Sequence, residues 1–253
     1  MRTIYILPGP LSRTAKGTPE VERRGLFLRD FAAPDNEVDI RDVPYGPASI
    51  ESAYEEYISV APTAALMLEA EEEGYDAAIL GCFGDPGLDA MREVCTRMLV
   101  VGPAEASCYG SLMLGDHLGI ITVTSSVVRP IRDLVGRLGI ASKLAGIAVV
   151  ETPVLELYDR ERSLERAVAA GQGLIEHHGA NVLTLGCMTM AFLDLGVELQ
   201  ERLGVPVLNP VRAALGTAEG LVRSGVHHSK LAYPRPPKLA ATDGSTIADL
   251  LLT

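Results

Sequence analysis

Two stretches decide the predicted fold of this 253-residue chain: YDAAILGCFGDPGLDAMREVCTRMLVVGPAEAS (75–107) and ANVLTLGCMTMAFLDLGVELQERLGVPVLNPVRAA (180–214). Each runs through an apolar strand, a Gly-Cys pair, a helical stretch, a second apolar strand and a proline. Cys82 and Cys187 are 105 positions apart, whereas Pro103 and Pro210 are 107 apart. The two stretches therefore keep register to within two residues, and the chain is predicted to be duplicated.

Short apolar runs with helical patterns between them extend this repeat along the whole chain. They cover residues 3–7, 76–80, 97–102, 118–124, 144–150, 181–186 and 205–209. Such runs are typical of parallel strands buried on both faces, so the predicted fold class is α/β with parallel sheets. Ligands bind at the carboxyl ends of such sheets. If the two halves face each other, both cysteines point into one cleft.

Local signals predict where the helices begin and end. Ser49 is expected to start a helix, while Gly74 and Gly179 are expected to end two others. Pro62 is expected to divide the segment 50–73 into two helices, because proline lacks the amide hydrogen that a helix interior requires.

Composition excludes several classes of function. The formal net charge is −11, with a pI near 4.9 and no clustered basic residues, so nucleic acid is excluded as a partner. The first apolar run ends at Pro8, which is too early for a signal peptide, and no later stretch is long enough for a membrane span. We expect a cytoplasmic protein that does not bind membranes. The four cysteines have no C-x-x-C spacing and are expected to be free thiols.

Motifs for metals and nucleotides are missing from the sequence. The five histidines show no H-E-x-x-H spacing, so no metal is expected. No phosphate loop occurs, and GCFGDPG (81–87) lacks the G-x-G-x-x-G spacing of dinucleotide sites. We therefore expect no cofactor.

The position of the paired cysteines predicts reactive thiols. A thiol between a strand and a helix meets unpaired backbone N–H groups and the positive end of the helix dipole, which lower its pKa from about 8.5 towards neutrality. Asp85 and Pro86 are expected to be the N-cap and first residue of that helix. Gly81, Gly84 and Gly87 are expected to let the backbone approach a ligand closely.

Two thiols on opposite walls of a cleft indicate proton transfer at one carbon. One thiolate removes a proton from a carbon next to a carbonyl, and the opposite thiol returns a proton to the other face. Backbone N–H groups stabilise the enolate formed on the way. The predicted reaction is racemisation without a cofactor. Cys95 and Cys108 have no counterpart in the repeat and are expected to be small buried hydrophobes.

Several motifs resemble one known family. They are GPASIES (46–52), GCFGDPGLDAMRE (81–93), PVLELYD (153–159), LGCMTM (185–190), GVPVLNPVRAAL (204–215) and HSKLAYPRPPK (228–238). Together they resemble the hydantoin racemase branch of the aspartate/glutamate racemase superfamily, over nearly the whole chain.

The resemblance implies two similar Rossmann-like subdomains related by a pseudo-twofold axis, with the active site in the cleft between them. It implies a first subdomain of residues 1–102 plus 211–253, a second of residues 103–210, and a homo-oligomer. It also implies racemisation of 5-substituted hydantoins or of allantoin by Cys82 and Cys187. The positions expected to contact this small-molecule substrate are Pro8, Gly9, Phe83, Gly84, Thr124, Ser125, Met188 and Thr189.

One departure concerns the turn after the first strand. The family usually has an Asn-Pro-Asn-Thr-like turn there, whereas this chain reads LPGPLS (7–12). The loss of amide side chains removes hydrogen bonds to a polar ring. This departure bears on the choice of substrate and leaves the two cysteines unaffected.

Two alternatives remain open. The same scaffold suits an amino-acid racemase, or an isomerase or lyase acting on another small carbonyl compound, as in maleate isomerases and arylmalonate decarboxylases. The decarboxylases have one cysteine, so Cys187 counts against that branch. The second alternative is a non-catalytic ligand-binding protein, which would not exchange a substrate proton with solvent.

Overall fold

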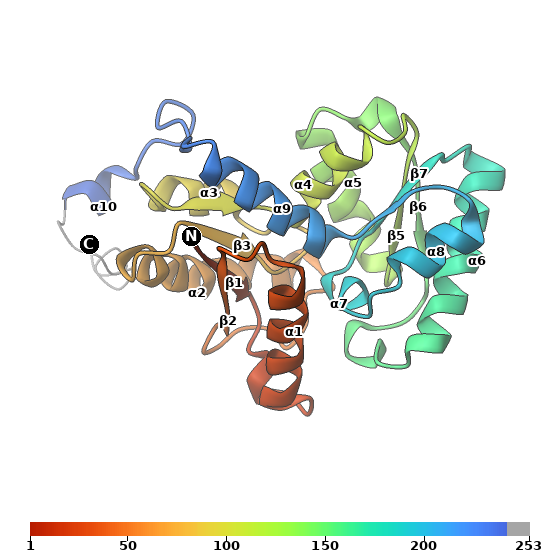
Figure 1. Ribbon diagram of the computed structural model, residues 1–253, viewed down its shortest axis with the longest axis horizontal. Coiled ribbons are helices and arrows are strands. Elements are labelled where there is room, and N and C mark those ends of the chain that lie inside the picture. Colours follow the sequence, from red (N-terminus) through yellow and green to blue (C-terminus); the bar gives the residue numbers. More distant parts are fainter. Residues whose placement is uncertain (242–253) are drawn as a thin grey trace.

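The duplicated stretches belong to two parallel sheets with the same strand order (Figure 1). The computed structural model describes residues 1–241. One sheet has the order β2-β1-β3-β4 and the other β6-β5-β7-β8. The strands are β1 (Arg2–Leu7), β2 (Glu37–Asp42), β3 (Ala77–Leu80), β4 (Leu99–Val101), β5 (Leu118–Thr122), β6 (Leu144–Val149), β7 (Val182–Leu185) and β8 (Val207–Leu208).

Helices cover both sheets. The α-helices are α1 (Gly17–Phe31), α2 (Ala53–Glu72), α3 (Leu88–Val94), α4 (Pro103–Ser111), α5 (Val128–Arg137), α6 (Arg160–His178), α7 (Met188–Ala191), α8 (Gly196–Leu203), α9 (Pro210–Arg223) and α10 (Pro237–Ala241). Short 3-10 helices are η1 (Leu11–Arg13), η2 (Ser125–Val127), η3 (Ala141–Lys143) and η4 (Val154–Glu156).

The predicted fold class is confirmed: the chain is an α/β protein with two Rossmann-like halves and parallel sheets. Each of the seven apolar runs contains a strand. The sequence analysis missed β2, whose sequence EVDIRD alternates apolar and charged residues. β2 lies at the edge of its sheet, where one side of the strand meets solvent, so it needs no continuous apolar run.

The chain returns to the first sheet after completing the second. α9 contacts β3, β4 and α1, while α4 contacts β7 and β8; Figure 1 shows α9, in blue, beside the first sheet. These contacts accord with the predicted division into residues 1–102 plus 211–253 and residues 103–210. The division itself stays a prediction, and residues 242–253 lie outside the described part of the chain.

The expected break at Pro62 is wrong, because α2 continues through it. Pro62 lies within a buried face of α2 that packs on β1 and α3. This packing offsets the cost of proline inside a helix, about 3 kcal/mol. The expected start at Ser49 is also wrong. The N-cap is Ser52, whose hydroxyl oxygen accepts a hydrogen bond from the Glu55 amide at 3.3 Å.

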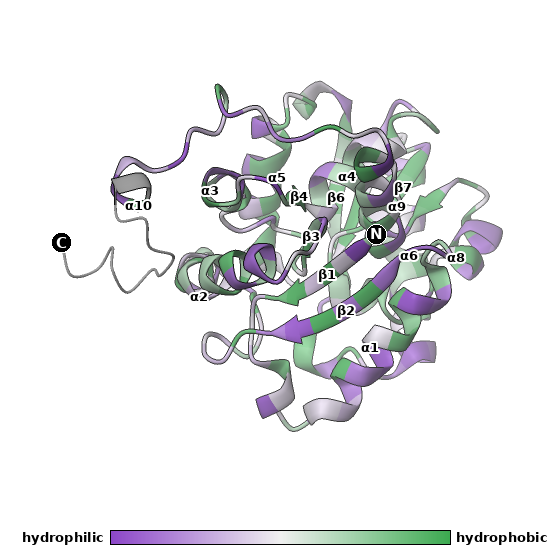
Figure 2. Ribbon diagram, turned by 60° about the vertical axis from the view of Figure 1, so that its left-hand side comes forward, coloured by the Kyte–Doolittle hydropathy of each residue, from purple (hydrophilic) through white to green (hydrophobic). Residues whose placement is uncertain are grey.

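One apolar core continues from the first half into the second. Its buried members include Tyr5 and Phe83 of the first half, Cys187 and Phe192 of the second, and Val211 of α9. A separate cluster lies between the first sheet and α2 and α3. Figure 2 shows hydrophilic residues on the outward turns of α1 and α8. Within residues 1–241, no helix has both the length and the apolar character needed to cross a membrane.

Candidate active site

A cavity of about 100 Å³ lies where the two halves meet. Segments that follow the carboxyl ends of β1, β3, β5 and β7 contribute to its walls. Its lining residues are Leu7, Pro8, Gly9, Leu11, Arg24, Ala48, Ser49, Ile50, Glu56, Gly81, Cys82, Phe83, Gly84, Val123, Val127, Ile131, Val154, Leu155, Tyr158, Gly186, Cys187, Met188 and Thr189. Both predicted thiols therefore line one cavity.

The two cysteines occupy equivalent places in the two halves. Cys82 follows β3 and Cys187 follows β7 after one intervening glycine. β3 lies between β1 and β4, and β7 lies in the same way between β5 and β8. The repeat therefore places one thiol from each half at the same cavity.

The environment of Cys82 differs from the expectation. α3 begins at Leu88 after Gly87, so Cys82 does not stand at a helix N-terminus. The prediction that Asp85 caps this helix and that Pro86 is its first residue is wrong, because Gly87 is the N-cap. The carboxylate of Asp85 accepts hydrogen bonds from the amides of Ala104 at 3.1 Å and Glu105 at 2.9 Å. Asp85 thus caps α4, and the loop after Cys82 is tied to the start of that helix.

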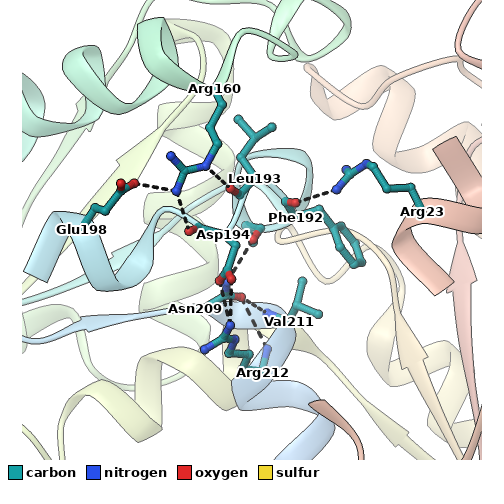
Figure 3. Close-up of polar contacts among 10 residues, drawn as sticks. Arg23, Arg160, Phe192, Leu193, Asp194, Glu198, Asn209, Val211 and Arg212 are labelled. Carbon is teal, nitrogen blue, oxygen red and sulfur yellow. Dashed lines mark hydrogen bonds and ion pairs between the residues drawn. The ribbon is translucent and has the colours of Figure 1, made fainter. Parts of the chain in front are cut away.

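Cys187 is the N-cap residue of α7, as the strand-to-helix pattern predicted. Polar groups from distant segments bind the carbonyl groups at the end of this short helix (Figure 3). Arg23 donates to the Phe192 carbonyl at 2.9 Å, Arg160 to the Leu193 carbonyl at 3.1 Å, and Asn209 to the Ala191 carbonyl at 2.9 Å. These bonds satisfy carbonyls that a helix end leaves unpaired, and they hold α7 in place behind the thiol.

The glycines beside Cys82 make room for other parts of the protein. A Cβ atom on Gly81 would lie 2.6 Å from the Ile6 carbonyl oxygen and 2.7 Å from Cε1 of Tyr5. A Cβ atom on Gly84 would lie 2.5 Å from Oε1 of Glu56. The absence of side chains at Gly81 and Gly84 thus makes room for neighbouring protein atoms, and the expected close approach of a ligand to these glycines stays a prediction.

The expected fall of both thiol pKa values towards neutrality is also wrong. Burial raises the pKa of Cys82, and the N–H of Gly84 only partly opposes it. Burial likewise raises the pKa of Cys187, although the N–H groups of Met190 and Thr189 and the charge of Arg24 lower it. Removal from water thus outweighs the local N–H donors and raises the pKa of both thiols.

Opposite charges lie beside the two thiols. Arg24 of α1 donates from Nη2 to Oγ1 of Thr189 at 3.0 Å and lowers the pKa of Cys187. Its Nε donates to Glu20 at 2.8 Å, but Glu20 also pairs with Arg23, which leaves this cluster with one excess positive charge. Glu56 of α2 raises the pKa of Cys82. The site is therefore more favourable to a thiolate at Cys187 than at Cys82.

Most of the predicted site residues line the cavity. They are Pro8, Gly9, Cys82, Phe83, Gly84, Cys187, Met188 and Thr189. Thr124 and Ser125 do not line it. The Thr124 hydroxyl pairs with Ser126 at 2.9 Å and Ser125 is exposed, while Val123 and Val127 take the positions in the wall.

Four polar residues of the wall were missed as site residues: Arg24, Ser49, Glu56 and Tyr158. Arg24 had a local signal, because Glu20 lies one helical turn before it and such a pair shares one helix face. Ser49 and Tyr158 lie in the motifs GPASIES (46–52) and PVLELYD (153–159), which carried the family resemblance. Glu56 had no such signal, because the direction of its side chain depends on how α2 packs. Within residues 1–241, no group of three or more His, Cys, Asp or Glu is placed to hold a metal.

Comparisons with known proteins agree with this geometry. The family model described as Asp/Glu/Hydantoin racemase matches residues 26–218. A hydantoin racemase of Pseudomonas sp. (strain NS671) is 37% identical over 212 residues, covering 83% of this chain and 84% of the relative.

Two solved structures are similar over nearly the whole chain. The allantoin racemase from Klebsiella pneumoniae has a TM-score of 0.82 and 30% identity, covering 94% of this chain and 96% of that one. The allantoin racemase from Pseudomonas fluorescens has a TM-score of 0.85 and 27% identity, covering 94% and 97%.

Proposed function

The chain belongs to the Asp/Glu/hydantoin racemase family and is an isomerase of the racemase class, and on this premise we propose that it inverts a carbon next to a carbonyl by a two-thiol mechanism without a cofactor. One observation carries the proposal: Cys82 and Cys187 line a single cavity from equivalent strands in opposite halves. A small substrate between them presents one face of its stereocentre to each sulfur.

The proposed reaction transfers one proton in and one proton out. The thiolate on one wall removes the proton from the stereocentre, and the electron pair of the C–H bond moves into the adjacent carbonyl to form an enolate. The thiol on the other wall then donates its proton to the opposite face of that carbon. The product has inverted configuration, and the two sulfurs have exchanged protonation states.

Charge placement supports a starting state for this cycle. Arg24 lowers the pKa of Cys187, whereas Glu56 raises that of Cys82. We propose that Cys187, having given its proton to solvent before the substrate binds, is the thiolate that removes the substrate proton, and that Cys82 is then the acid. In the reverse direction the roles exchange.

The walls support an apolar substituent on the substrate. Side chains of Leu7, Leu11, Val123, Val127, Ile131, Val154 and Leu155 line the cavity. No amide side chain follows the first strand, where the family usually has asparagines. We therefore propose hydantoins with an aliphatic 5-substituent as substrates, since the C5 proton of the ring is acidified by the neighbouring carbonyl. Allantoin, whose substituent is a polar ureide, is the second candidate because of the similar allantoin racemase structures.

Isotope exchange tests this function. Enantiopure 5-isobutylhydantoin in deuterium oxide is expected to lose optical rotation while its C5 proton signal disappears from the NMR spectrum. Cys82→Ser and Cys187→Ser should each lower the rate by about 10²- to 10⁴-fold, whereas Cys95→Ala, which alters a thiol outside the cavity, should not. Wild-type rates in both serine variants would contradict the mechanism.

A panel of substrates separates the alternatives. Turnover of aspartate or glutamate in place of hydantoins would indicate an amino-acid racemase. Binding of hydantoins without any exchange would indicate a ligand-binding protein. Allantoin turning over faster than 5-isobutylhydantoin would contradict the proposed preference for an aliphatic substituent.

We also propose a homo-oligomer in the cytoplasm. Exposed Tyr54, Tyr57 and Ile58 share one face of α2 and support a contact between subunits. Light scattering on the purified protein measures the subunit number, and a monomer at micromolar concentration would contradict the proposed oligomer.

A further inference from the structure

The proposed two-thiol reaction, on which this inference rests, leaves the enzyme in a changed state after every turnover. If Cys82 has given its proton to the substrate, it is a thiolate and Cys187 is a thiol when the product leaves. The next molecule of the same enantiomer needs the opposite arrangement. Cys187 must therefore release a proton to solvent and Cys82 must regain one, although both line a cavity walled largely by apolar groups.

Glu56 is placed to carry the proton that Cys82 regains. Its Oε1 lies 2.5 Å from the point where a Cβ atom of Gly84 would stand, and the sulfur of Cys82 lies 3.8 Å from the same point. Because Gly84 has no side chain, the carboxylate of Glu56 and the thiol of Cys82 both lie near this point, with no Cβ atom between them. Burial raises the pKa of Glu56, which increases the share of the protonated form that has a proton to donate.

Glu56 also faces a second space outside the cavity. A groove of about 790 Å³ is lined by residues of α2, α3, α4 and α5 and of the loop after Cys82. Only Glu56 and Gly84 line both the cavity and this groove among residues 1–241. Glu56 is therefore the one titratable side chain of the described chain that is common to both.

The surroundings leave this carboxylate available. None of the described residues makes a hydrogen bond to it, and Arg137 of α5 is the cation that acts on it from the groove. The other charged groups lining the groove are Asp85, Asp89, Arg92 and Glu105. Two of them pair with each other, Arg92 and Glu105, so neither competes for Glu56.

The other polar groups of the cavity are less suited to this transfer. The guanidinium of Arg24 is held by hydrogen bonds to Glu20 and Thr189. Burial raises the pKa of Tyr158, which makes its hydroxyl a poor acid near neutrality. Neither residue lines the outer groove.

We propose that Glu56 is a proton relay between Cys82 and solvent. The Glu56 carboxylic acid donates its proton to the Cys82 thiolate, which gives a neutral thiol and a carboxylate. The carboxylate then takes a proton from water in the groove. In the opposite direction, the carboxylate accepts the proton of the Cys82 thiol and releases it to water.

Comparing kcat with kcat/KM separates a proton relay at Glu56 from a role of Glu56 in the chemical step. For each enantiomer of 5-isobutylhydantoin, kcat includes the return of the free enzyme to its starting state, whereas kcat/KM does not. Glu56→Gln removes the transferable proton and keeps the shape. We expect kcat to fall by about tenfold or more, kcat/KM to stay within about threefold, and added acetate to restore kcat. Glu69→Gln, an exposed site on the same helix, is the matched control and should behave as wild type.

A measurement without substrate gives a second readout. Removing the charge of Glu56 lowers the pKa of Cys82, so iodoacetamide should alkylate Cys82 faster in Glu56→Gln, with Cys187 unchanged. Glu56→Asp keeps the carboxyl group and should retain more of kcat than Glu56→Gln, provided that melting curves match wild type.

The outcomes distinguish the relay from the function beneath it. An unchanged kcat in Glu56→Gln, or an equal fall of kcat and kcat/KM, would overturn the relay while wild-type racemisation stands. Unaltered alkylation of Cys82 would overturn it as well. Failure of the wild-type protein to exchange the C5 proton of any hydantoin would instead overturn the proposed function.

Discussion

Replacing Arg24 by methionine tests the electrostatic difference between the two thiols. Methionine keeps most of the apolar stem of the arginine side chain but removes its charge. The guanidinium carbon of Arg24 lies 4.9 Å from the centre of the Phe192 ring. Arg24 is only 4% exposed and binds Thr189, two residues after Cys187. Since Arg24 lowers the pKa of Cys187, its loss should raise that pKa further above the ordinary value of about 8.5.

The size of the effect follows from the charges around Arg24. An opposite charge within about 4–6 Å shifts a pKa by roughly 1–3 units. Glu20 offsets part of the charge of Arg24, so we expect the lower end, about one unit. One unit corresponds to about 1.4 kcal/mol and a tenfold smaller thiolate fraction. Glu20 keeps Arg23 as a partner at 2.7 Å, so the loss of stability should be roughly 1–3 kcal/mol, less than for a fully broken buried pair.

Alkylation with iodoacetamide between pH 7 and 10, followed by mass spectrometry of the two cysteine peptides, measures each thiol separately. In Arg24→Met, alkylation of Cys187 should slow about tenfold while that of Cys82 stays the same, and kcat/KM should fall by a similar factor. Arg129→Met, on the exposed side of α5, is the matched control. Equal slowing of both thiols, or none at Cys187, would refute the assignment of Arg24 to Cys187.

Three further predictions concern stability, each measured by urea unfolding. Asp85→Ala removes the cap of α4 and should cost about 1–2 kcal/mol, with Asp85→Asn closer to wild type; equal losses would argue against capping. Gly81→Ala forces a Cβ to within 2.6 Å of the Ile6 oxygen and should cost about 1–3 kcal/mol; an unchanged midpoint would contradict the packing there. Burial raises the pKa of Cys95 and Cys108 to about 12, so both favour the neutral thiol in the folded state. Their contribution to the free energy of unfolding is complete below the pKa of an unfolded cysteine, about 8.5, and is lost as the pH rises from there to about 12. Replacing both cysteines with alanine should make the free energy of unfolding fall less steeply over this pH range. An unchanged slope would contradict the raised pKa values of these two thiols.

Much of the fold could be predicted because the local signals agree with the tertiary structure. Buried parallel strands require continuous apolar runs, and the duplicated Gly-Cys stretches placed two of these strands in equivalent positions. β2 was missed because an edge strand tolerates charged residues. The break at Pro62 was expected from a local cost that packing of α2 on β1 and α3 outweighs.

The sequence predicted which segments of the chain form the site. It predicted less well which way their side chains point and which groups surround them. The residues adjoining the two cysteines line the cavity because strand ends of a parallel sheet meet at one edge. Thr124 and Ser125 also follow a strand, but their side chains turn away from the cavity. Direction after a strand depends on the next few backbone angles, which no local pattern specifies.

The sequence by itself determined the duplication, the α/β class and the pair of thiols, because each leaves a periodic or repeated pattern along the chain. Only the tertiary structure decided the electrostatics of those thiols. Burial raises both pKa values, Arg24 comes from α1 to Cys187, and Glu56 comes from α2 to Cys82. These influences act through space between segments far apart in sequence, so they depend on how the two halves pack and cannot be read from neighbouring residues.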